Sequence, residues 1–240
     1  MKLTQKLSKQ SFYMGMIVLL PTYLLFGVYI VSALFQFLMN TFHIQLSSSD
    51  LNAYYNFFFD LIFACFAIIV FRKELKKQFN HLKEQDTMDF IHQVLLGIPV
   101  LYGASFVGSL LSMVLTGDMS SSENQILIEE MMKQVPVIMI VSVTVLAPIL
   151  EELIFRLLLF TGFYKWGRWA GYLIAGGLFG FLHVYQPILQ GNFMEILQIF
   201  PYLFMGLGLC FVYEKADNIF APILCHAIMN GFSVITIMFM

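Results

Sequence analysis

Ionisable and amide side chains stand at helical spacing inside three apolar segments of this chain. A charged side chain in the hydrocarbon region of a bilayer costs several kcal/mol unless it faces a partner or a wet cavity, so it indicates a functional site. Buried Glu, His and Arg side chains build catalytic sites or proton relays. The three patterns are Glu151-Glu152-x-x-x-Arg156, Phe179-x-x-x-His183 and His226-x-x-x-Asn230.

The three motifs lie at a similar depth along their segments. Counted from the charged residue that bounds each segment, they lie about 17–23 Å along a helix, near the middle of a bilayer. The separations are 13 residues from Glu152 to Lys165, 15 from Arg168 to His183 and 11 from Lys215 to His226. This shared depth predicts a single polar pocket between three helices.

Within the first motif the two glutamates should have different roles. Glu152 and Arg156 are four residues apart, so they share a helix face and can form a buried pair that neutralises one carboxylate. Glu151 points about 100° away from Glu152 and has no charge partner on its own helix, which makes it the better catalytic candidate. His226 and Asn230 also share a face. Taken singly, each His could merely bond a carbonyl, and Asn230 could merely link two helices.

Two features predict how the pocket is shaped. Pro148 removes a backbone donor and frees the carbonyl of Thr144, so we expect a kink that opens a cavity beside the glutamates. Gly176-x-x-x-Gly180 permits close helix contact and should bring His183 towards the helix that carries the glutamates. Asp60 lies mid-membrane in another segment, where it is either an auxiliary site or a protonated core residue.

The composition requires a membrane environment. Of 240 residues, 59% are hydrophobic and only 12% are charged, against roughly 25% charged in a soluble domain. We expect an all-α, polytopic transmembrane helix bundle in the cell membrane, with about seven spans. These are 12–39, 52–71, 89–116, 136–163, 169–187, 193–213 and 219–239.

The cationic residues predict the orientation of this bundle. With single crossings, 11 of the 13 Lys and Arg residues fall at junctions on one side, which predicts a cytoplasmic N-terminus and an outer C-terminus. The chain divides into N-terminal transmembrane helices over 1–134, with a cytoplasmic loop at 72–88, and a catalytic helical core over 135–240. Residues 125–134 form either a short interfacial helix or a polar lead-in to the next span.

Several classes of function are excluded by what the sequence lacks. No basic tail or interleaving of basic and aromatic residues is present, so nucleic acid is not an expected partner. The chain has no His-Glu-x-x-His motif of a zinc protease. Ser105 is followed by Phe106 rather than Gly, which excludes a rhomboid-type serine site, and Asp60 and Asp118 lie at different depths, which excludes an aspartyl dyad.

The three motifs resemble those of the CAAX-protease and bacteriocin-processing intramembrane proteases, also called the Abi or type II CAAX prenyl endopeptidase family. That family carries a diglutamate with Arg four residues after the second Glu, a Phe-x-x-x-His and a His-x-x-x-Asn. The present chain has all three in order, on separate spans, over residues 136–232. Each motif alone is weak, but the ordered set is specific.

The resemblance implies peptide-bond hydrolysis within the membrane, on a peptide or protein substrate at the bilayer. It implies Glu151 as general base, His183 as a holder of the attacking water, His226 and Asn230 as oxyanion donors, and Glu152 with Arg156 as organisers of the site. No cofactor is certain. Two Glu and two His are also plausible ligands for zinc or another divalent metal, but Asn is a poor zinc ligand, which favours water held by glutamate.

The short loops favour a bacterial type of member that processes peptide signals or confers bacteriocin self-immunity, although prenylated CAAX tails are a substrate class of eukaryotic relatives. Two other hypotheses remain from the sequence. One is a catalytically idle membrane scaffold that regulates a partner protein. The other is a proton-coupled carrier, which is disfavoured because inverted repeats and paired broken helices are absent.

Overall fold

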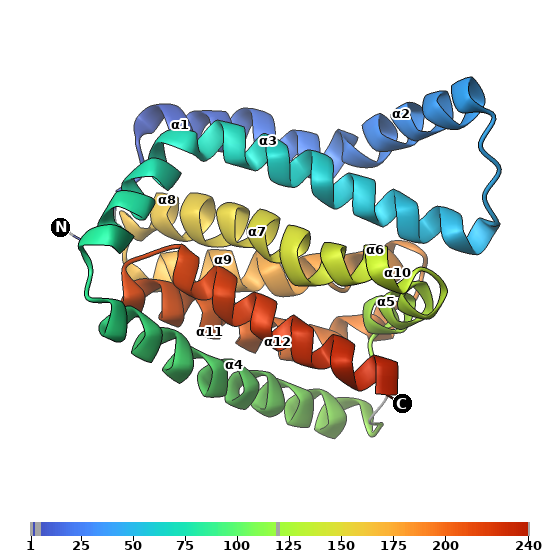
Figure 1. The fold of residues 1–240 in the computed structure, drawn as a ribbon. Helices are drawn as coiled ribbons and strands as arrows, with labels where there is room; N and C mark the ends of the chain where they lie inside the picture. The colour runs from blue at the N-terminus through green and yellow to red at the C-terminus, as the bar shows by residue number, and fades with distance from the viewer. Residues whose placement is uncertain (1, 3–5, 119–120, 240) are drawn as a thin grey trace.

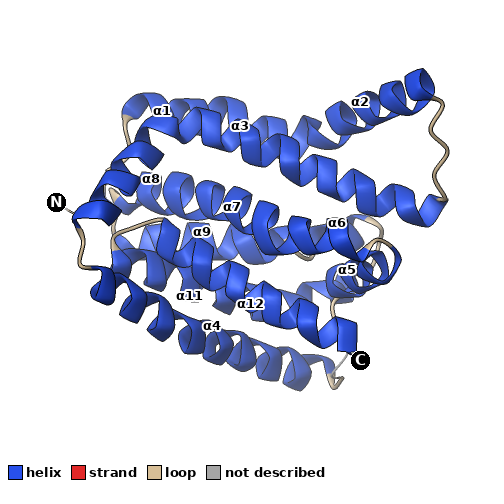
Figure 2. Ribbon diagram, viewed as in Figure 1, coloured by secondary structure: helices blue, strands red, loops and turns tan. Residues whose placement is uncertain are grey.

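The computed structural model describes residues 2, 6–118 and 121–239, and every regular element in these ranges is helical, as Figure 2 shows. The first half contains α1 (Lys9–Tyr13), η2 (Met14–Leu19), η3 (Thr22–Phe26), α2 (Gly27–Phe42), α3 (Ser48–Glu84), α4 (Thr87–Thr116) and α5 (Glu123–Gln134). The second half contains α6 (Pro136–Val141), η4 (Ser142–Leu146), α7 (Ala147–Glu152), η5 (Leu153–Phe160), α8 (Thr161–Tyr164), α9 (Arg168–Leu182), α10 (Tyr185–Leu189), η6 (Phe193–Gln198), α11 (Ile199–Ala216) and α12 (Phe220–Phe239).

The all-helical prediction is confirmed, but the count of seven spans is not. Within the described residues six helices are long and apolar enough to cross a membrane, so the chain is a multi-pass membrane protein. These are Lys9–Phe42, Asp50–Glu84, Thr87–Thr116, Pro136–Tyr164, Phe193–Ala216 and Phe220–Phe239. The orientation of the bundle in the membrane stays a prediction.

The predicted span over 169–187 is the one that fails the length criterion. Its helix, α9, has 15 residues and ends at Leu182, which gives about 22 Å of helix against about 30 Å of hydrocarbon. His183 and Val184 interrupt the helix before α10 begins. The chain still passes from the end of the bundle where α8 lies to the end where α5 lies, because α10 continues the path of α9 (Figure 1).

The predicted cytoplasmic loop at 72–88 is also mostly helical. Helix α3 continues through these polar residues to Glu84, and only Gln85 and Asp86 separate it from α4. The Asp86 carboxylate caps α4 by accepting from the backbone N–H groups of Met88 and Asp89. After this two-residue connection the chain reverses, so α3 and α4 run in opposite directions through the bundle, as Figure 1 shows.

Residues 123–134 form a separate helix, α5, as one of the two sequence interpretations held. Ser122 caps it by accepting from the N–H of Gln125, and it ends at Val135, whose backbone leaves the helical region. Helix α5 lies across the end of the bundle rather than along it (Figure 1). It packs against α3 and α6, so it covers one end of the space between the longer helices.

Close helix packing in the core depends on glycine, but not with the partner that we expected. Gly176 and Gly180 of α9 face α11: an added Cβ would lie 2.8 Å from a Leu207 methyl carbon and 2.9 Å from the Leu203 backbone nitrogen. Gly206 of α11 meets Gly176 from the other side. The glycine pair therefore brings α9 against α11, and the helix that carries the glutamates packs on a different side of α9.

Candidate active site

The centre of the site is a fully buried ion pair. Arg156 Nη1 lies 2.9 Å from Glu152 Oε1, and both side chains are 0% exposed. Arg156 Nη2 donates to the carbonyl of Gly206 at 3.1 Å, and the guanidinium lies 4.6 Å from the centre of the Phe179 ring. The predicted pairing of Glu152 with Arg156 is confirmed. It ties the glutamate helix to α11 and α9 at once.

His226 joins this pair from α12. Its Nδ1 lies 2.8 Å from Glu152 Oε1, and because a carboxylate only accepts, Nδ1 is the donor. This bond turns the other ring nitrogen, Nε2, towards Glu151, whose Oε2 lies 3.8 Å away. Glu152 thus serves Arg156 and His226 together, and His226 is the link between the two glutamates.

Glu151 has the opposite environment to Glu152. Its side chain is 18% exposed, and its Oε2 is buried without a hydrogen-bond partner among the described residues. A buried acceptor left unpaired in a native site calls for an explanation, such as a catalytic role or a water molecule. Oε2 of Glu152 and Nε of Arg156 are likewise unpaired in the described chain. Of these three atoms, only that of Glu151 belongs to a residue that lines the cavity described below.

His183 stands at the break between α9 and α10. Its Nδ1 lies 2.7 Å from the carbonyl oxygen of Phe179, so Nδ1 donates, and in the neutral ring Nε2 is an acceptor. Its ring stacks on Tyr202 with centroids 4.3 Å apart and an interplanar angle of 19°. The Tyr202 hydroxyl in turn lies 2.6 Å from the hydroxyl of Ser122. One hydrogen bond and one stacked ring therefore fix the orientation of His183.

Asn230 makes a bond that the sequence did not indicate. Its Nδ2 donates to the carbonyl of Val143 at 2.9 Å. Val143 lies in η4, a π-helical segment in which Ala147 N–H bonds to Ser142 C=O, five residues back. In that register the next donor would come from residue 148, which is proline and has no N–H. Asn230 supplies the missing donor, and its second amide hydrogen has no partner among the residues that the structure describes.

The predicted kink at Pro148 therefore takes the form of a π-helical segment just before it. A second π-helical segment, η5, follows the glutamates directly and is buried along all eight of its residues. Segments of this kind are rare and recur at functional sites. Glu151 and Glu152 lie at the end of the short α-helical stretch between them.

A cavity of about 340 Å³ joins these groups. Glu151, His183, His226 and Asn230 all line it, whereas Glu152 and Arg156 lie behind its wall. Four of the six predicted site residues thus line one shared pocket, as the sequence predicted. The other two lie in the core behind the pocket wall. The roles of these residues stay predictions.

Asp60 also lines this cavity, from α3. It accepts a short hydrogen bond from the Ser142 hydroxyl, and Asn56 Nδ2 donates to it at 3.2 Å. Asp60 thus belongs to the cavity wall but is held by two donors of its own. Ser142, Asn56 and Tyr202 escaped the sequence reasoning, because a lone hydroxyl, amide or aromatic residue in an apolar run carries no spacing signal.

The metal-ligand interpretation does not fit this geometry. Nδ1 of His183 and Nδ1 of His226 are bonded to protein oxygen atoms, which leaves only their Nε2 atoms as possible ligands. In the described ranges no group of three or more His, Cys, Asp or Glu side chains is arranged to hold a metal ion. A protein zinc site takes three or four such ligands. We therefore derive no step of the chemistry through a metal.

The fold and the site define a membrane-embedded helical protein with a Glu–His–Asn pocket and a buried Glu–Arg support. Comparison with known proteins agrees. Residues 133–232, less than half of the chain, match the family described as type II CAAX prenyl endopeptidase Rce1-like. The resemblance that the motifs suggested is confirmed.

Two curated bacterial relatives extend the comparison. The chain is 31% identical over 150 residues to the "Putative membrane peptidase YdiL" of Bacillus subtilis (strain 168), covering 58% of this chain and 57% of that protein. It is 24% identical over 143 residues to the "UPF0177 protein YvdC" of Lactococcus lactis subsp. lactis (strain IL1403), covering 60% and 51%. The match thus spans about half the length of these relatives. No solved structure matches the chain.

Proposed function

We propose that this chain is an intramembrane endopeptidase that hydrolyses a peptide bond with a water molecule activated by Glu151. The observation that carries the proposal is the unpaired, buried Oε2 of Glu151, which belongs to a cavity-lining residue and lies 3.8 Å from Nε2 of His226. An acceptor in this position can take a hydrogen from water. The family match and the peptidase name of one relative support the same activity.

In the proposed reaction Glu151 removes a proton from water while the water oxygen bonds to the scissile carbonyl carbon. His183 holds that water with its unprotonated Nε2. The carbonyl oxygen becomes an oxyanion, which an amide hydrogen of Asn230 and the cationic form of His226, with hydrogens on both ring nitrogens, stabilise. Glu151 then returns the proton to the leaving nitrogen, and the carbon–nitrogen bond breaks. The products are a carboxylic acid and an amine, which become a carboxylate and an ammonium group when the acid passes its proton to the amine, so no other reactant is needed.

The buried pair explains how these groups stay in place without water. Arg156 offsets the charge of Glu152, and Glu152 orients His226. Donors held in this way need no reorganisation when charge develops on the substrate, and they act most strongly where the dielectric is low. The proposed substrate is a membrane-associated peptide or protein tail. Peptide-signal processing and bacteriocin self-immunity are the roles that the resemblance implies.

The test uses purified protein in lipid vesicles, incubated with a proteome-derived peptide mixture that is analysed by mass spectrometry. The wild type should create new termini, and Glu151→Gln should create none while eluting as a folded protein. Equal products from both proteins would remove Glu151 as the base. If the wild type cleaves nothing, the idle-scaffold hypothesis replaces the enzyme.

Metal dependence is tested on the same vesicles. With water held by glutamate, a strong chelator should leave the cleavage rate unchanged, and the metal content of active protein should be substoichiometric. Stoichiometric zinc that is lost together with activity in His226→Ala, and restored with added zinc, would overturn the glutamate-held water. It would leave the protease assignment intact.

We further propose that the N-terminus is cytoplasmic and the C-terminus is outside. The start of α1 and the end of α12 lie at opposite ends of the bundle (Figure 1), which supports an opposite placement of the termini. A tag placed before residue 2 and one at Gln85 should resist external protease in intact cells, while a tag after residue 239 should be cleaved. A protected tag at the C-terminal end would reverse this proposal.

A further inference from the structure

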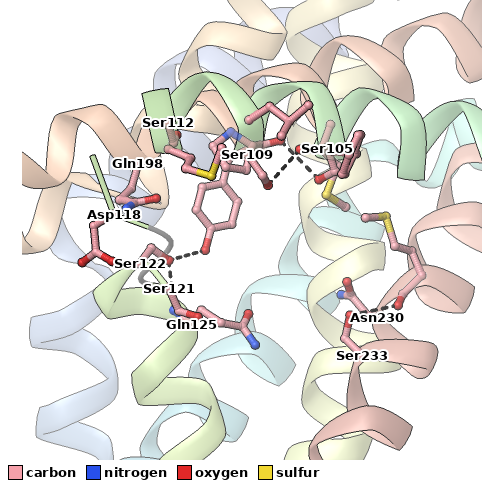
Figure 3. A pocket seen from close by; sticks show the side chains of 17 residues that line it. Ser105, Ser109, Ser112, Asp118, Ser121, Ser122, Gln125, Gln198, Asn230 and Ser233 are labelled. Atoms are coloured by element: carbon pink, nitrogen blue, oxygen red, sulfur yellow. Dashed lines mark hydrogen bonds between the residues drawn. The ribbon is translucent and has the colours of Figure 1, made fainter. Parts of the chain in front are cut away.

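A second cavity, of about 430 Å³, adjoins the candidate active site and is used by no step proposed above. It lies between α4, α5, α11 and α12, and Figure 3 shows Ser105 and Ser109 on α4 facing across it towards Asn230 and Ser233 on α12. We refer to it as the serine-lined cavity. Its lining contains six Ser residues, at positions 105, 109, 112, 121, 122 and 233.

This cavity adjoins the catalytic one. Both are lined by the same five residues, which form a common wall: Gln125, Tyr202, Met205, Asn230 and Ser233. Asn230 is the proposed oxyanion donor, and Tyr202 stacks on His183. A peptide whose scissile bond lies beside Asn230 therefore has its flanking residues next to the serine-lined cavity.

The hydroxyls of this cavity present acceptors rather than donors. Ser109 donates to the carbonyl of Ser105 at 3.0 Å, Ser112 to that of Leu197 at 2.6 Å, and Ser233 to that of Met229 at 3.2 Å. A hydroxyl has one hydrogen and two lone pairs, so these oxygens keep acceptor capacity after donating. A ligand that brings N–H donors satisfies them.

The electrostatics of the lining select among possible ligands. Asp118, at the C-terminal end of α4, is the one charged side chain among its lining residues. An acyl chain offers no donors, and a lipid phosphate or a peptide carboxylate would add acceptors and negative charge to a site that has both. An extended peptide offers a row of backbone N–H groups, each of which costs several kcal/mol in a membrane when left unpaired.

We propose that the serine-lined cavity binds the part of the substrate that flanks the scissile bond, as an extended peptide free of acidic side chains and positively charged at its outer end. This inference rests on the proposed function, since it assigns the substrate to the same site. In this proposal the flanking segment of the substrate begins beside Asn230, next to the scissile bond. Its other end lies near Asp118, whose negative charge favours a cationic group.

The first experiment compares cleavage profiles from the peptide mixture. Ser109→Met should narrow the cavity and change which residues are accepted on one side of the scissile bond. Val107→Met is the matched control, because Val107 is on the same helix but points outward and is 50% exposed. It should keep the wild-type profile. A wild-type profile from Ser109→Met would overturn the proposal.

The second experiment measures binding without cleavage. A photoreactive residue at position 109, in the Glu151→Gln protein in vesicles, should crosslink a biotin-labelled random peptide library several times more than the same residue at position 107. Equal labelling at both positions, or labelling of lipid instead of peptide at position 109, would overturn the assignment. If wild-type protein cleaves no peptide but crosslinking at position 109 succeeds, the cavity stands and the protease proposal fails.

A third experiment tests whether Asp118 favours peptides with a positive charge at the outer end. Asp118→Asn should reduce the preference for peptides with Lys, Arg or a free amino group at the outer end by about two- to fivefold at low salt, as for an exposed ion pair. The difference should vanish at high ionic strength, because salt screens an exposed charge. An unchanged preference at low salt would remove Asp118 from the site.

Discussion

The two sides of the Glu151–Glu152 pair differ in how completely they are sealed. On one side Glu152 and Arg156 are wholly buried, and η5 continues as eight buried residues. On the other side Glu151 meets a cavity that His183, His226 and Asn230 also line. A single helical step of about 100° separates the two environments. The sealed side is the support, and the open side is the one that can hold water and a peptide.

This contrast shows why adjacent, identical side chains can have different functions. Glu152 has two donors on one oxygen, from Arg156 and His226, so its position is fixed by charge and hydrogen bonding. Glu151 has an oxygen with no partner among the described residues, so it can serve a ligand. Mutation of Glu152 should therefore lower stability, and mutation of Glu151 should lower activity.

The largest effect is expected from a mutation that breaks the buried Glu152–Arg156 pair. Glu152→Gln should leave Arg156 in the core without a counter-charge and destabilise the fold by about 3–5 kcal/mol, as for other broken buried pairs. Protein yield and thermal unfolding temperature in detergent should both fall. Glu151→Gln is the matched control: it should abolish cleavage yet unfold near the wild-type temperature. Equal stability of the two variants would contradict the contrast between them.

The next effect separates two functions of one residue on the open side. Asn230→Ala should lower kcat by about 10²–10³-fold with little change in KM, because the amide serves the oxyanion rather than the bound ground state. It should also cost about 1–3 kcal/mol, since the Val143 carbonyl loses its donor.

Adding Pro148→Ala to Asn230→Ala sharpens this distinction. The alanine returns a backbone N–H near the Val143 carbonyl, so unfolding temperature should recover in part while kcat stays low. Recovery of kcat together with stability would mean that Asn230 acts only by holding η4 in shape. Unfolding temperature and steady-state rates, measured on the same preparations, decide between these outcomes.

A smaller effect concerns the ring that orients His183. Tyr202→Leu removes the stacked ring and should lower kcat by about two- to tenfold, the equivalent of about 0.5–1.5 kcal/mol. Tyr202→Phe keeps the ring, loses only the hydrogen bonds of the hydroxyl, with Ser122 and Asn124, and should restore most of kcat. If both variants lose kcat equally, the hydroxyl rather than the stacked ring is what matters.

The smallest effect is expected at Asp60, in the cavity wall away from the proposed reacting atoms. Asp60→Asn keeps an acceptor oxygen for Ser142 and should change stability by less than about 1 kcal/mol. We expect kcat to stay within a few-fold of wild type. A loss of about 100-fold in kcat would instead make Asp60 an auxiliary catalytic group, the alternative that its sequence position leaves open.

The sequence allowed the chemistry of the site to be predicted better than its architecture. The i, i+4 spacing of Glu152 and Arg156 determines a shared face in any helix, so their pairing could be foreseen. Equal depth in separate apolar segments predicted that Glu151, His183 and His226 would share a pocket, which the cavity bears out.

Other features depend on contacts that one sequence does not reveal. Hydropathy counts apolar residues, so it did not register that α9 stops at Leu182 and leaves His183 at a break. Gly176 and Gly180 indicated close packing but not that the partner is α11. The polar residues 72–84 were predicted as a loop that is helical in part, and hydropathy did not show that the helix of the preceding apolar run continues through all of them. The bond from Asn230 to Val143 requires the π-helical register, which hydrophobic periodicity does not predict.

The π-helical segment η4 also limits how the length of this chain can change. A turn with bonds to the fifth residue holds about one residue more than an α-helical turn, so Ser142–Leu146 accommodates an inserted residue. Deleting one residue there would restore an ordinary helix and rotate Ser142 by about 100° relative to Glu151. Ser142 would leave Asp60, and Val143 would leave Asn230. A single-residue deletion within Ser142–Leu146 would therefore take two side-chain contacts away from Asp60 and Asn230, which both line the catalytic cavity.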